Sequence, residues 1–562
     1  MVSTSKALWT LLLVLLTLPA SAQVTVEPVD AAANTIIRKQ GLEQSQLEGV
    51  LQTMNDVYGA RLTGSAELDR ASDWAAEEFR KMGLVNVRKE AWGPFGRGWS
   101  LDGFYLHASG TDFSFPVMGF PKAWAGPTNG RKSAEVLIVT AETPEEVKAM
   151  ASRIRGNVVL MGAERPLEEP FEPIAHRLGD SSLLEMANWA PSGEAGAARP
   201  RMGGTPEQME RMRVQRAVTS AIFEAGPAAI IDGSRLGDYG TIFVSAASVP
   251  VPPDAPAFGG RVTPYSTDKP TVVPQFTLAV EHFNRIHRLV SGGHKVTLDF
   301  ELSARYYDAD PMEYNIVGEI PGTDPTIGDE LVMVGGHYDA WHAGTGMTDN
   351  AAGSATMMEV MRILRDTYKE LGKQPRRTIR IALWTGEEQG LLGSRAYVAQ
   401  QFAERQAVPG AAPGGMGGPQ GPLTLKPAHD QLSVYYNLDN GTGKVRGVYT
   451  QGNEAIAPIF RSWLKPFEDL GASTVTLQNT GGTDHQSFDG VGLPGFQFIQ
   501  ETISYDTKTH HSNMDVYDHG ILADLQQAAT VIASFVYHSA ERDEKMPRKA
   551  LPQPAPRPTS SN

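Results

Sequence analysis

The sequence predicts an α/β fold, in which helices flank a mostly parallel central sheet and a β-rich segment is inserted. Two observations predict it. From Asn315 onward, short apolar strands alternate with amphipathic helices, as in parallel sheets. Before that, from about Phe113, short apolar runs separated by Gly and Pro are typical of β structure. With 562 residues the chain exceeds one ordinary core, so two or three domains are expected.

The first 22 residues have the pattern of a signal peptide. Lys6 supplies a positive charge, Ala7 to Leu18 is an apolar stretch, and Ala20-Ser21-Ala22 resembles a cleavage site. The apolar stretch is too short to span ~30 Å of hydrocarbon comfortably, which disfavours a stable membrane anchor. We expect the mature chain to begin near Gln23 and to be exported, to the periplasm or the extracellular space.

The composition excludes two classes of function. The formal net charge of −14 arises from 50 basic and 64 acidic residues, whereas nucleic-acid binders carry basic patches. The chain contains no cysteine, which excludes thiol catalysis, disulfides and the cysteine-linked anchor of a lipoprotein. A nucleic-acid partner and a thiol enzyme are therefore not expected.

The predicted elements divide the chain into two domains. The domain formed by residues 30–112 and 306–542 begins with a helix, because Leu68 to Met82 carry an apolar stripe at three- and four-residue spacing. The inserted domain, 113–305, contains a polar, irregular stretch from Glu164 to about Val214. Its predicted strands are 135–139, 157–161, 228–231, 241–244 and 295–302.

The alternating region ends the folded part of the sequence. Its predicted helices are 357–371, ended by Gly372, 455–470 and 521–539. Its predicted strands are 330–335, 379–383, 432–438 and 495–499. Pro409–Pro422 is a Gly/Pro-rich loop, and the Pro-rich tail, 546–562, is expected to be disordered.

Side chains that can bind metal follow three of the predicted strands. His337 and Asp339 follow the first, Glu387 and Glu388 the second, and Asp439 the third. Each alone has an ordinary interpretation, as a turn residue or a solvated side chain. Together they indicate a metal site, because the carboxyl ends of strands in an open α/β sheet line one crevice. Imidazole and carboxylate ligands without thiolate favour zinc, with cobalt or manganese as substitutes.

Six short motifs surround these positions. They are Gly336-His337-Tyr338-Asp339, Thr348-Asp349-Asn350-Ala351-Ala352-Gly353, Trp384-Thr385-Gly386-Glu387-Glu388-Gln389-Gly390, Asn437-Leu438-Asp439, Thr483-Asp484-His485 and His511-Ser512-Asn513-Met514-Asp515. In type and order they resemble the aminopeptidase Y family of di-zinc exopeptidases, most of all its carboxypeptidase Q branch and bacterial relatives. The likeness covers about residues 30–110 and 306–540, and the segment between resembles the protease-associated domain of that family.

The resemblance implies a complete set of protein ligands for two zinc ions. Asp349 would bridge the ions, His337 and Asp439 would complete one, and Glu388 and His511 the other. His510 competes with His511 for the last place, and the family pattern His-Thr-x-x-Asp favours His511.

The resemblance also implies supporting roles. Asp339 would accept a proton from the His337 ring and fix its tautomer. Asp484 and His485 match a family motif near the site, with less defined roles. The peptide bond after the bridging Asp349 is often cis in the family.

These assignments predict a secreted metallo-exopeptidase that cleaves short peptides near one end. Two metals ~3.5–4 Å apart can share a water and lower its pKa. Glu387, beside the ligand Glu388, is then the predicted general base. The choice between aminopeptidase and carboxypeptidase Q-like dipeptidase stays open, as do the role of the inserted domain and a possible homodimer.

Two other functions are compatible with the fold. One is a zinc-dependent glutaminyl cyclase, which the resemblance associates with a single zinc and an incomplete ligand set. The other is a catalytically silent binding protein that has lost ligands. All five ligand positions and Glu387 are present here, which favours hydrolysis.

Overall fold

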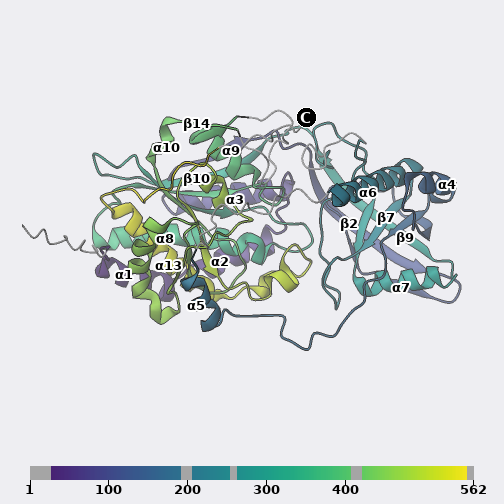
Figure 1. The fold of residues 1–562 in the computed structure, drawn as a ribbon, viewed down its shortest axis with the longest axis horizontal. Helices are drawn as coiled ribbons and strands as arrows, with labels where there is room; N and C mark the ends of the chain where they lie inside the picture. The colour runs from purple at the N-terminus through teal and green to yellow at the C-terminus, as the bar shows by residue number, and fades with distance from the viewer. Residues whose placement is uncertain (1–26, 191–205, 253–261, 407–420, 554–562) are drawn as a thin grey trace, which may run out of the picture.

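The computed structural model describes residues 27–190, 206–252, 262–406 and 421–553. The predicted signal peptide and most of the predicted loop at 409–422 lie outside these ranges. Within them, no helix is long and apolar enough to cross a membrane. Two eight-stranded sheets lie side by side in the long direction of the molecule (Figure 1).

The first sheet confirms the predicted α/β architecture. Its order is β1 (Val85–Trp92), β10 (Glu313–Ile320), β12 (Thr378–Trp384), β11 (Leu331–His337), β15 (Leu432–Asn437), β18 (Gly495–Gln500), β16 (Val445–Tyr449), β17 (Thr474–Thr476). The four central strands, from β12 to β18, are parallel. Antiparallel pairs occur towards the edges, so the sheet is mixed rather than parallel throughout.

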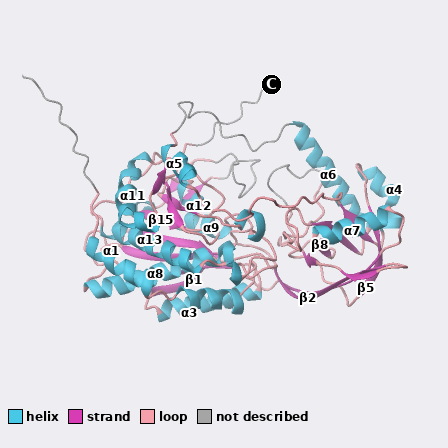
Figure 2. Cartoon of the chain, turned by 90° about the horizontal axis from the view of Figure 1, so that it is seen from below, coloured by secondary structure: helices cyan, strands magenta, loops and turns pink. Residues whose placement is uncertain are grey.

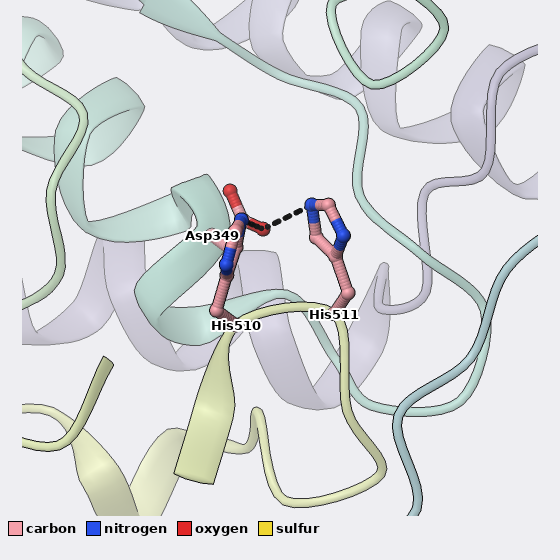
Figure 3. Close-up of side chains that lie close together, drawn as sticks. All are labelled: Asp349, His510 and His511. Atoms are coloured by element: carbon pink, nitrogen blue, oxygen red, sulfur yellow. Dashed lines mark ion pairs between the residues drawn. The ribbon is translucent and has the colours of Figure 1, made fainter. Parts of the chain in front are cut away.

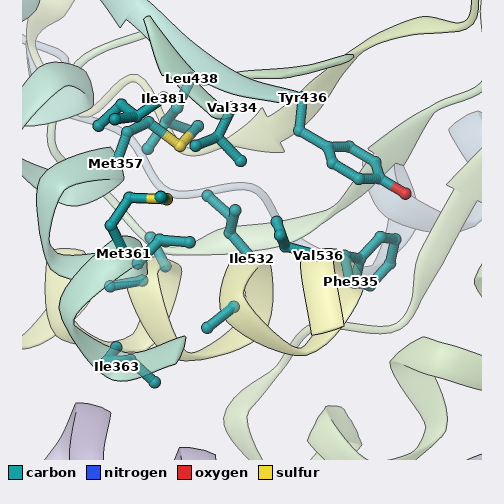
Figure 4. Packing of buried hydrophobic residues seen from close by; sticks show 14 of the residues in the cluster. Val334, Met357, Met361, Ile363, Ile381, Tyr436, Leu438, Ile532, Phe535 and Val536 are labelled. Atoms are coloured by element: carbon teal, nitrogen blue, oxygen red, sulfur yellow. The ribbon is translucent and has the colours of Figure 1, made fainter. Parts of the chain in front are cut away.

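Helices cover both faces of this sheet. The larger hydrophobic cluster joins one face to helices α1 (Ala31–Arg38), α2 (Leu47–Gln52), α3 (Ala66–Lys81), α8 (Ala352–Leu371), α11 (Ala457–Leu464) and α13 (Leu522–Glu541). Figure 4 shows the part of this cluster that lies between the sheet and helices α8 and α13. The other face packs on α9 (Leu392–Gln401) and α12 (His485–Asp489), near α10 (Pro427–Gln431) and the short strands β13 (Ala403–Arg405) and β14 (Leu423–Leu425). Alternation along β11 explains this division, since Val332 and Val334 enter the first cluster and Leu331 and Met333 the second.

The second sheet belongs to the inserted region. Its order is β3 (Ser114–Pro116), β2 (Gly98–Ser109), β9 (Thr297–Tyr307), β5 (Lys132–Ile138), β6 (Val158–Met161), β7 (Ala229–Gly233), β8 (Gln275–Leu278), β4 (Gly119–Pro121). Helices α4 (Pro144–Ile154), α6 (Pro206–Ala225) and α7 (Val280–Ser291) pack against it. We call these strands and helices the second lobe and the part around the first sheet the first lobe (Figure 2). Because β5 to β8 are parallel and helix-covered, the second lobe is α/β rather than purely β-rich.

Three details of the inserted region differ from the prediction. The second sheet begins with β2 at Gly98, ahead of the expected boundary at 113, because β2 pairs with β9 along its whole length. Residues 241–244 form no strand; Phe243 makes a single bridge, to Ser512 of the first lobe. The stretch expected to be irregular contains α5 (Asp180–Asn188), which lies against the first lobe in Figure 1, and the start of α6.

The predicted disorder of the tail is wrong for residues 546–553. Met546 is buried in the first lobe. Arg548 donates a hydrogen bond to the carbonyl oxygen of Leu432 at 2.6 Å, and Lys549 forms an ion pair with Asp489. Specific contacts therefore hold this segment despite its proline-rich composition.

Candidate metal centre

The candidate residues meet at the carboxyl ends of the central strands. β11 ends at His337, whose neighbour in register on β12 is Trp384, immediately before the turn that carries Glu387 and Glu388. β15 ends at Asn437, two residues before Asp439. Residues distant in the sequence thus converge because parallel strands end at the same edge of the sheet.

The five predicted ligands form one cluster. The Nε2 atom of His337 lies 3.2 Å from Oδ1 of Asp349 and 3.3 Å from Oδ1 of Asp439. The Nε2 atom of His511 lies 3.3 Å from Oδ2 of Asp349 and 2.9 Å from Oε2 of Glu388. Asp349 therefore stands between the two histidines and presents one carboxylate oxygen to each.

His510 and His511 occupy different positions beside Asp349 (Figure 3). The Nε2 atom of His510 is 3.9 Å from Oδ2 of Asp349, and its ring stacks on Tyr505 at 4.5 Å. His511 contacts both Asp349 and Glu388 and has a backbone φ of 59°. The geometry thus favours His511 over its neighbour as a ligand.

The cluster fits a divalent metal. Oδ2 of Asp349 and Oε1 of Glu388 are buried without a hydrogen-bond partner among the described residues, which is costly unless a cation or water satisfies them. Burial and the nearby Asp349 raise the pKa of the Glu388 carboxyl well above its usual range. A bound cation would relieve this crowding of carboxylates, and the absence of thiolate among the donors is compatible with zinc.

Asp515 and Asn350 fix the position of Asp349. The carboxylate of Asp515 accepts hydrogen bonds from the backbone amides of Thr348, at 2.6 Å, and Asp349, at 3.2 Å. The Asn350 side chain donates to the carbonyl oxygen of Leu438 at 2.9 Å, and the Asp349–Asn350 peptide is cis, as the resemblance implies. The sequence marked Asp515 only as the last member of a motif and gave no sign of this contact.

Asp339 acts differently from the prediction. The Nδ1 atom of His337 faces the backbone oxygen of Asp339 at 3.0 Å, whereas the nearer carboxylate oxygen is 3.8 Å away. The carboxylate instead accepts the Thr63 hydroxyl at 2.8 Å and the backbone amides of Glu387 and Glu388, each at 3.2 Å. Asp339 thus orients the histidine through its backbone and holds the Glu387–Glu388 turn through its side chain.

Glu387 is buried next to the cluster. Burial raises the pKa of its carboxyl well above the usual range, against the opposing effect of His337, and the charges of Asp439 and Asp484 act in the same direction as burial. The turn before it contains Gly386 at φ 73°, where an added Cβ would lie 2.6 Å from the Trp92 ring. The local backbone therefore requires glycine immediately before the two glutamates.

Trp341 contacts two of the predicted ligands. Its indole Nε1 donates a hydrogen bond to Oε2 of Glu388 at 2.7 Å. Its ring lies 5.7 Å from that of His511 and 6.4 Å from that of Trp124 in the second lobe. A single tryptophan four residues after His337 carries no sequence signal, so only the tertiary structure identifies it.

Asp484 and His485 lie outside the cluster of five. Asp484 is fully buried, and burial raises the pKa of its carboxyl to about 7. The His485 ring pairs with the carbonyl oxygen of Thr480 at 3.2 Å, and burial lowers its pKa to about 4. Asp484 therefore adds negative potential near Glu387, whereas His485 has the contacts of a buried structural histidine.

Known proteins share these features. The family model described as Peptidase family M28 matches residues 315–536. Carboxypeptidase Q from Mus musculus is 25% identical over 498 residues, covering 88% of this chain and 85% of that protein. Carboxypeptidase Q from Homo sapiens is 26% identical over 513 residues, covering 90% and 88%. These relatives confirm the family resemblance of the motifs.

Solved structures share the fold. A peptidase M28 precursor from Shewanella amazonensis superposes with a TM-score of 0.61 at 20% identity, over 93% of this chain and 98% of that one. A zinc aminopeptidase from Bacillus subtilis gives a TM-score of 0.51 at 16% identity, over 89% and 96%. Residues 315–536 contain all five clustered side chains and Glu387. Residues 315–536 therefore match peptidase family M28, and the chain is a metallopeptidase, a hydrolase.

Proposed function

We propose that the protein is an exported di-zinc exopeptidase that hydrolyses a terminal peptide bond of short peptides. The position of Asp349, with one oxygen towards His337 and the other towards His511, supports two metals more than any other observation. His337 and Asp439 would hold one zinc, Glu388 and His511 the other, and Asp349 both. Two zinc ions bound there would lower the pKa of a shared water and polarise the scissile carbonyl.

Glu387 is the general base of the proposed reaction. Its neighbour Glu388 faces His511, which leaves the Glu387 carboxylate available to take a proton from water and deliver it to the leaving amine. The bonds from Asp339 to the backbone amides of both residues fix the turn. Adjacent glutamates are thereby given separate tasks.

Tyr505, whose ring stacks on that of His510, supplies a proton donor near Asp349. Burial raises the pKa of its hydroxyl well above the usual range, and the carboxylates of Asp349, Asp439 and Glu388 act in the same direction. A phenol that stays protonated can donate a hydrogen bond to the oxygen that gains charge when the peptide carbonyl is attacked. No sequence motif indicates this residue.

Export and substrate class are supported by the sequence and by the relatives. The first 22 residues have the signal-peptide pattern, and the matched relatives are named as carboxypeptidases and aminopeptidases. The complete set of five clustered side chains, together with Glu387, disfavours both a one-zinc glutaminyl cyclase and a silent binding protein.

Metal analysis combined with a peptide assay tests this function. Purified protein should contain two zinc ions per chain and hydrolyse free dipeptides. A chelator should abolish the activity, and added zinc should restore it. Fewer than two zinc ions in fully active protein, or zinc-loaded protein that cleaves no short peptide, would overturn the proposal.

A further inference from the structure

A cation of the second lobe lies beside the metal centre. Arg235 is exposed in the loop that follows β7, and its guanidinium lies 5.4 Å from the centre of the Phe243 ring. Phe243 in turn forms an isolated β-bridge with Ser512, the residue that follows His511. The charge of Arg235 therefore acts at the side of the centre formed by His511.

The loop that carries Arg235 is closed on itself. The Ser234 hydroxyl accepts a hydrogen bond from the backbone amide of Phe243 at 2.9 Å and donates one to the carbonyl oxygen of Leu236 at 2.7 Å. The backbone amide of Thr241 donates to the carbonyl oxygen of Asp238 at 2.8 Å. These bonds restrict the positions that Arg235 can reach.

The same loop is fastened to the segment that contains His511. The amide of Val244 donates to the carbonyl oxygen of His511 at 2.8 Å. The Asn513 side chain accepts from the amide of Ile242 at 2.7 Å and donates to the carbonyl oxygen of Gly240 at 3.2 Å. The backbone of the loop that carries Arg235 is thus held next to a predicted metal ligand, although the loop belongs to the other lobe.

Other cationic side chains near the centre interact with groups of the first lobe. The buried guanidinium of Arg61 donates to four backbone carbonyl oxygens, those of Tyr338, Met54, Thr345 and Gly346. The negative charges of Asp484 and Glu387 act on Arg395. Arg235 forms no ion pair within the part of the chain that the structure describes.

We propose that Arg235 binds the free α-carboxylate of the peptide substrate; this inference rests on the proposed function. A guanidinium can bind a carboxylate with two parallel hydrogen bonds, which gives both affinity and orientation. A free amino terminus would be repelled by Arg235, so the favoured substrates are dipeptides and other short peptides with an unblocked carboxyl end.

The test compares one dipeptide with its C-terminal amide in wild type and in Arg235→Met. Wild type should prefer the free acid. Arg235→Met should lower kcat/KM for the free acid about 100-fold, the scale of a lost charge-assisted interaction, and leave the amide unchanged. Arg235→Lys should retain part of the preference.

Arg285→Met is the matched control. Arg285 is also exposed in the second lobe, and its guanidinium lies 3.7 Å from the centre of the Phe115 ring. This variant should keep the preference of wild type. An unchanged preference in Arg235→Met, or an equal loss on both substrates, would overturn the role of Arg235 but not the proposed function. Hydrolysis of neither substrate by zinc-loaded wild type would overturn the proposed function, and the role of Arg235 with it.

Discussion

At the scale of single residues, the centre depends on side chains that orient the proposed ligands. Asp515 holds the backbone of Asp349, Asp339 holds the turn of the two glutamates, and Trp341 holds Glu388. The five side chains that lie together could be predicted, because their motifs occur in the order of the family. These supporting contacts could not, because they join residues whose proximity arises only from packing.

Removal of the Trp341 hydrogen bond should weaken metal binding. Trp341→Phe keeps an aromatic ring but loses the Nε1 donor to Glu388. Partners of this kind typically contribute 10- to 100-fold to metal affinity, so we expect about a tenfold weaker affinity for zinc in competition with a chromophoric chelator. Trp74→Phe, which changes a ring stacked on Tyr58, is the control. Unchanged zinc affinity in Trp341→Phe would show that the contact does not orient the ligand.

Glu313 should make stability depend on pH. Burial raises the pKa of its carboxyl to about 8 in the folded chain, whereas an unfolded glutamate titrates near ~4.3. Between these values the folded chain keeps a proton that the unfolded chain releases. The contribution of this proton to the free energy of unfolding is therefore fully present below about pH 4 and is lost as the pH rises through 8.

Glu313→Gln removes this titration. The free energy of unfolding of the variant should fall less steeply than that of wild type between about pH 5 and 8, by on the order of 1 kcal/mol per pH unit. Urea denaturation at several pH values measures both slopes. Parallel curves for the two proteins would contradict a raised pKa at Glu313.

At the scale of elements, the reliable predictions came from strong periodicity. The apolar residues Ile379, Ile381 and Leu383 occupy alternate positions in β12. The spacing of the apolar residues from Met357 to Leu371 predicts one face of α8, a helix that ends at Gly372. The predicted strand at 241–244 was wrong. Its apolar side chains are buried, but its backbone belongs to a loop that bonds to His511 and not to a neighbouring strand. Apolar runs identify burial, but not the hydrogen-bond partner of the backbone.

Close packing of α8 on the end of β15 should make Gly353 irreplaceable. A Cβ there would lie 2.1 Å from the carbonyl oxygen of Leu438, which is backbone and cannot move aside easily. Gly353→Ala should lower the free energy of unfolding by at least ~2 kcal/mol. In α2, Gly49→Ala meets nothing within 4 Å and should stabilise by about 0.4–1 kcal/mol. Thermal denaturation of both variants checks these opposite signs, and equal effects would refute the packing argument.

At the scale of the whole molecule, the second lobe contributes to the surroundings of the metal centre. Val244 bonds to the backbone of His511, Trp124 contacts Trp341, and Arg235 acts on His511. The sequence predicted an inserted domain, but its boundary was too late because β2 lacks a clean apolar alternation. The contacts of the inserted domain with the metal centre could not be predicted, because no sequence motif indicates which of its loops meets the first lobe.

Glu387 is proposed as a base and not a ligand, in a centre whose metals its neighbours would hold. Measurement of zinc content and turnover in Glu387→Gln tests it most directly. The variant should retain two zinc ions per chain while kcat falls by roughly 10²–10⁴-fold, the usual contribution of general acid–base catalysis. Normal turnover, or loss of zinc together with activity, would contradict the role of Glu387 as a base.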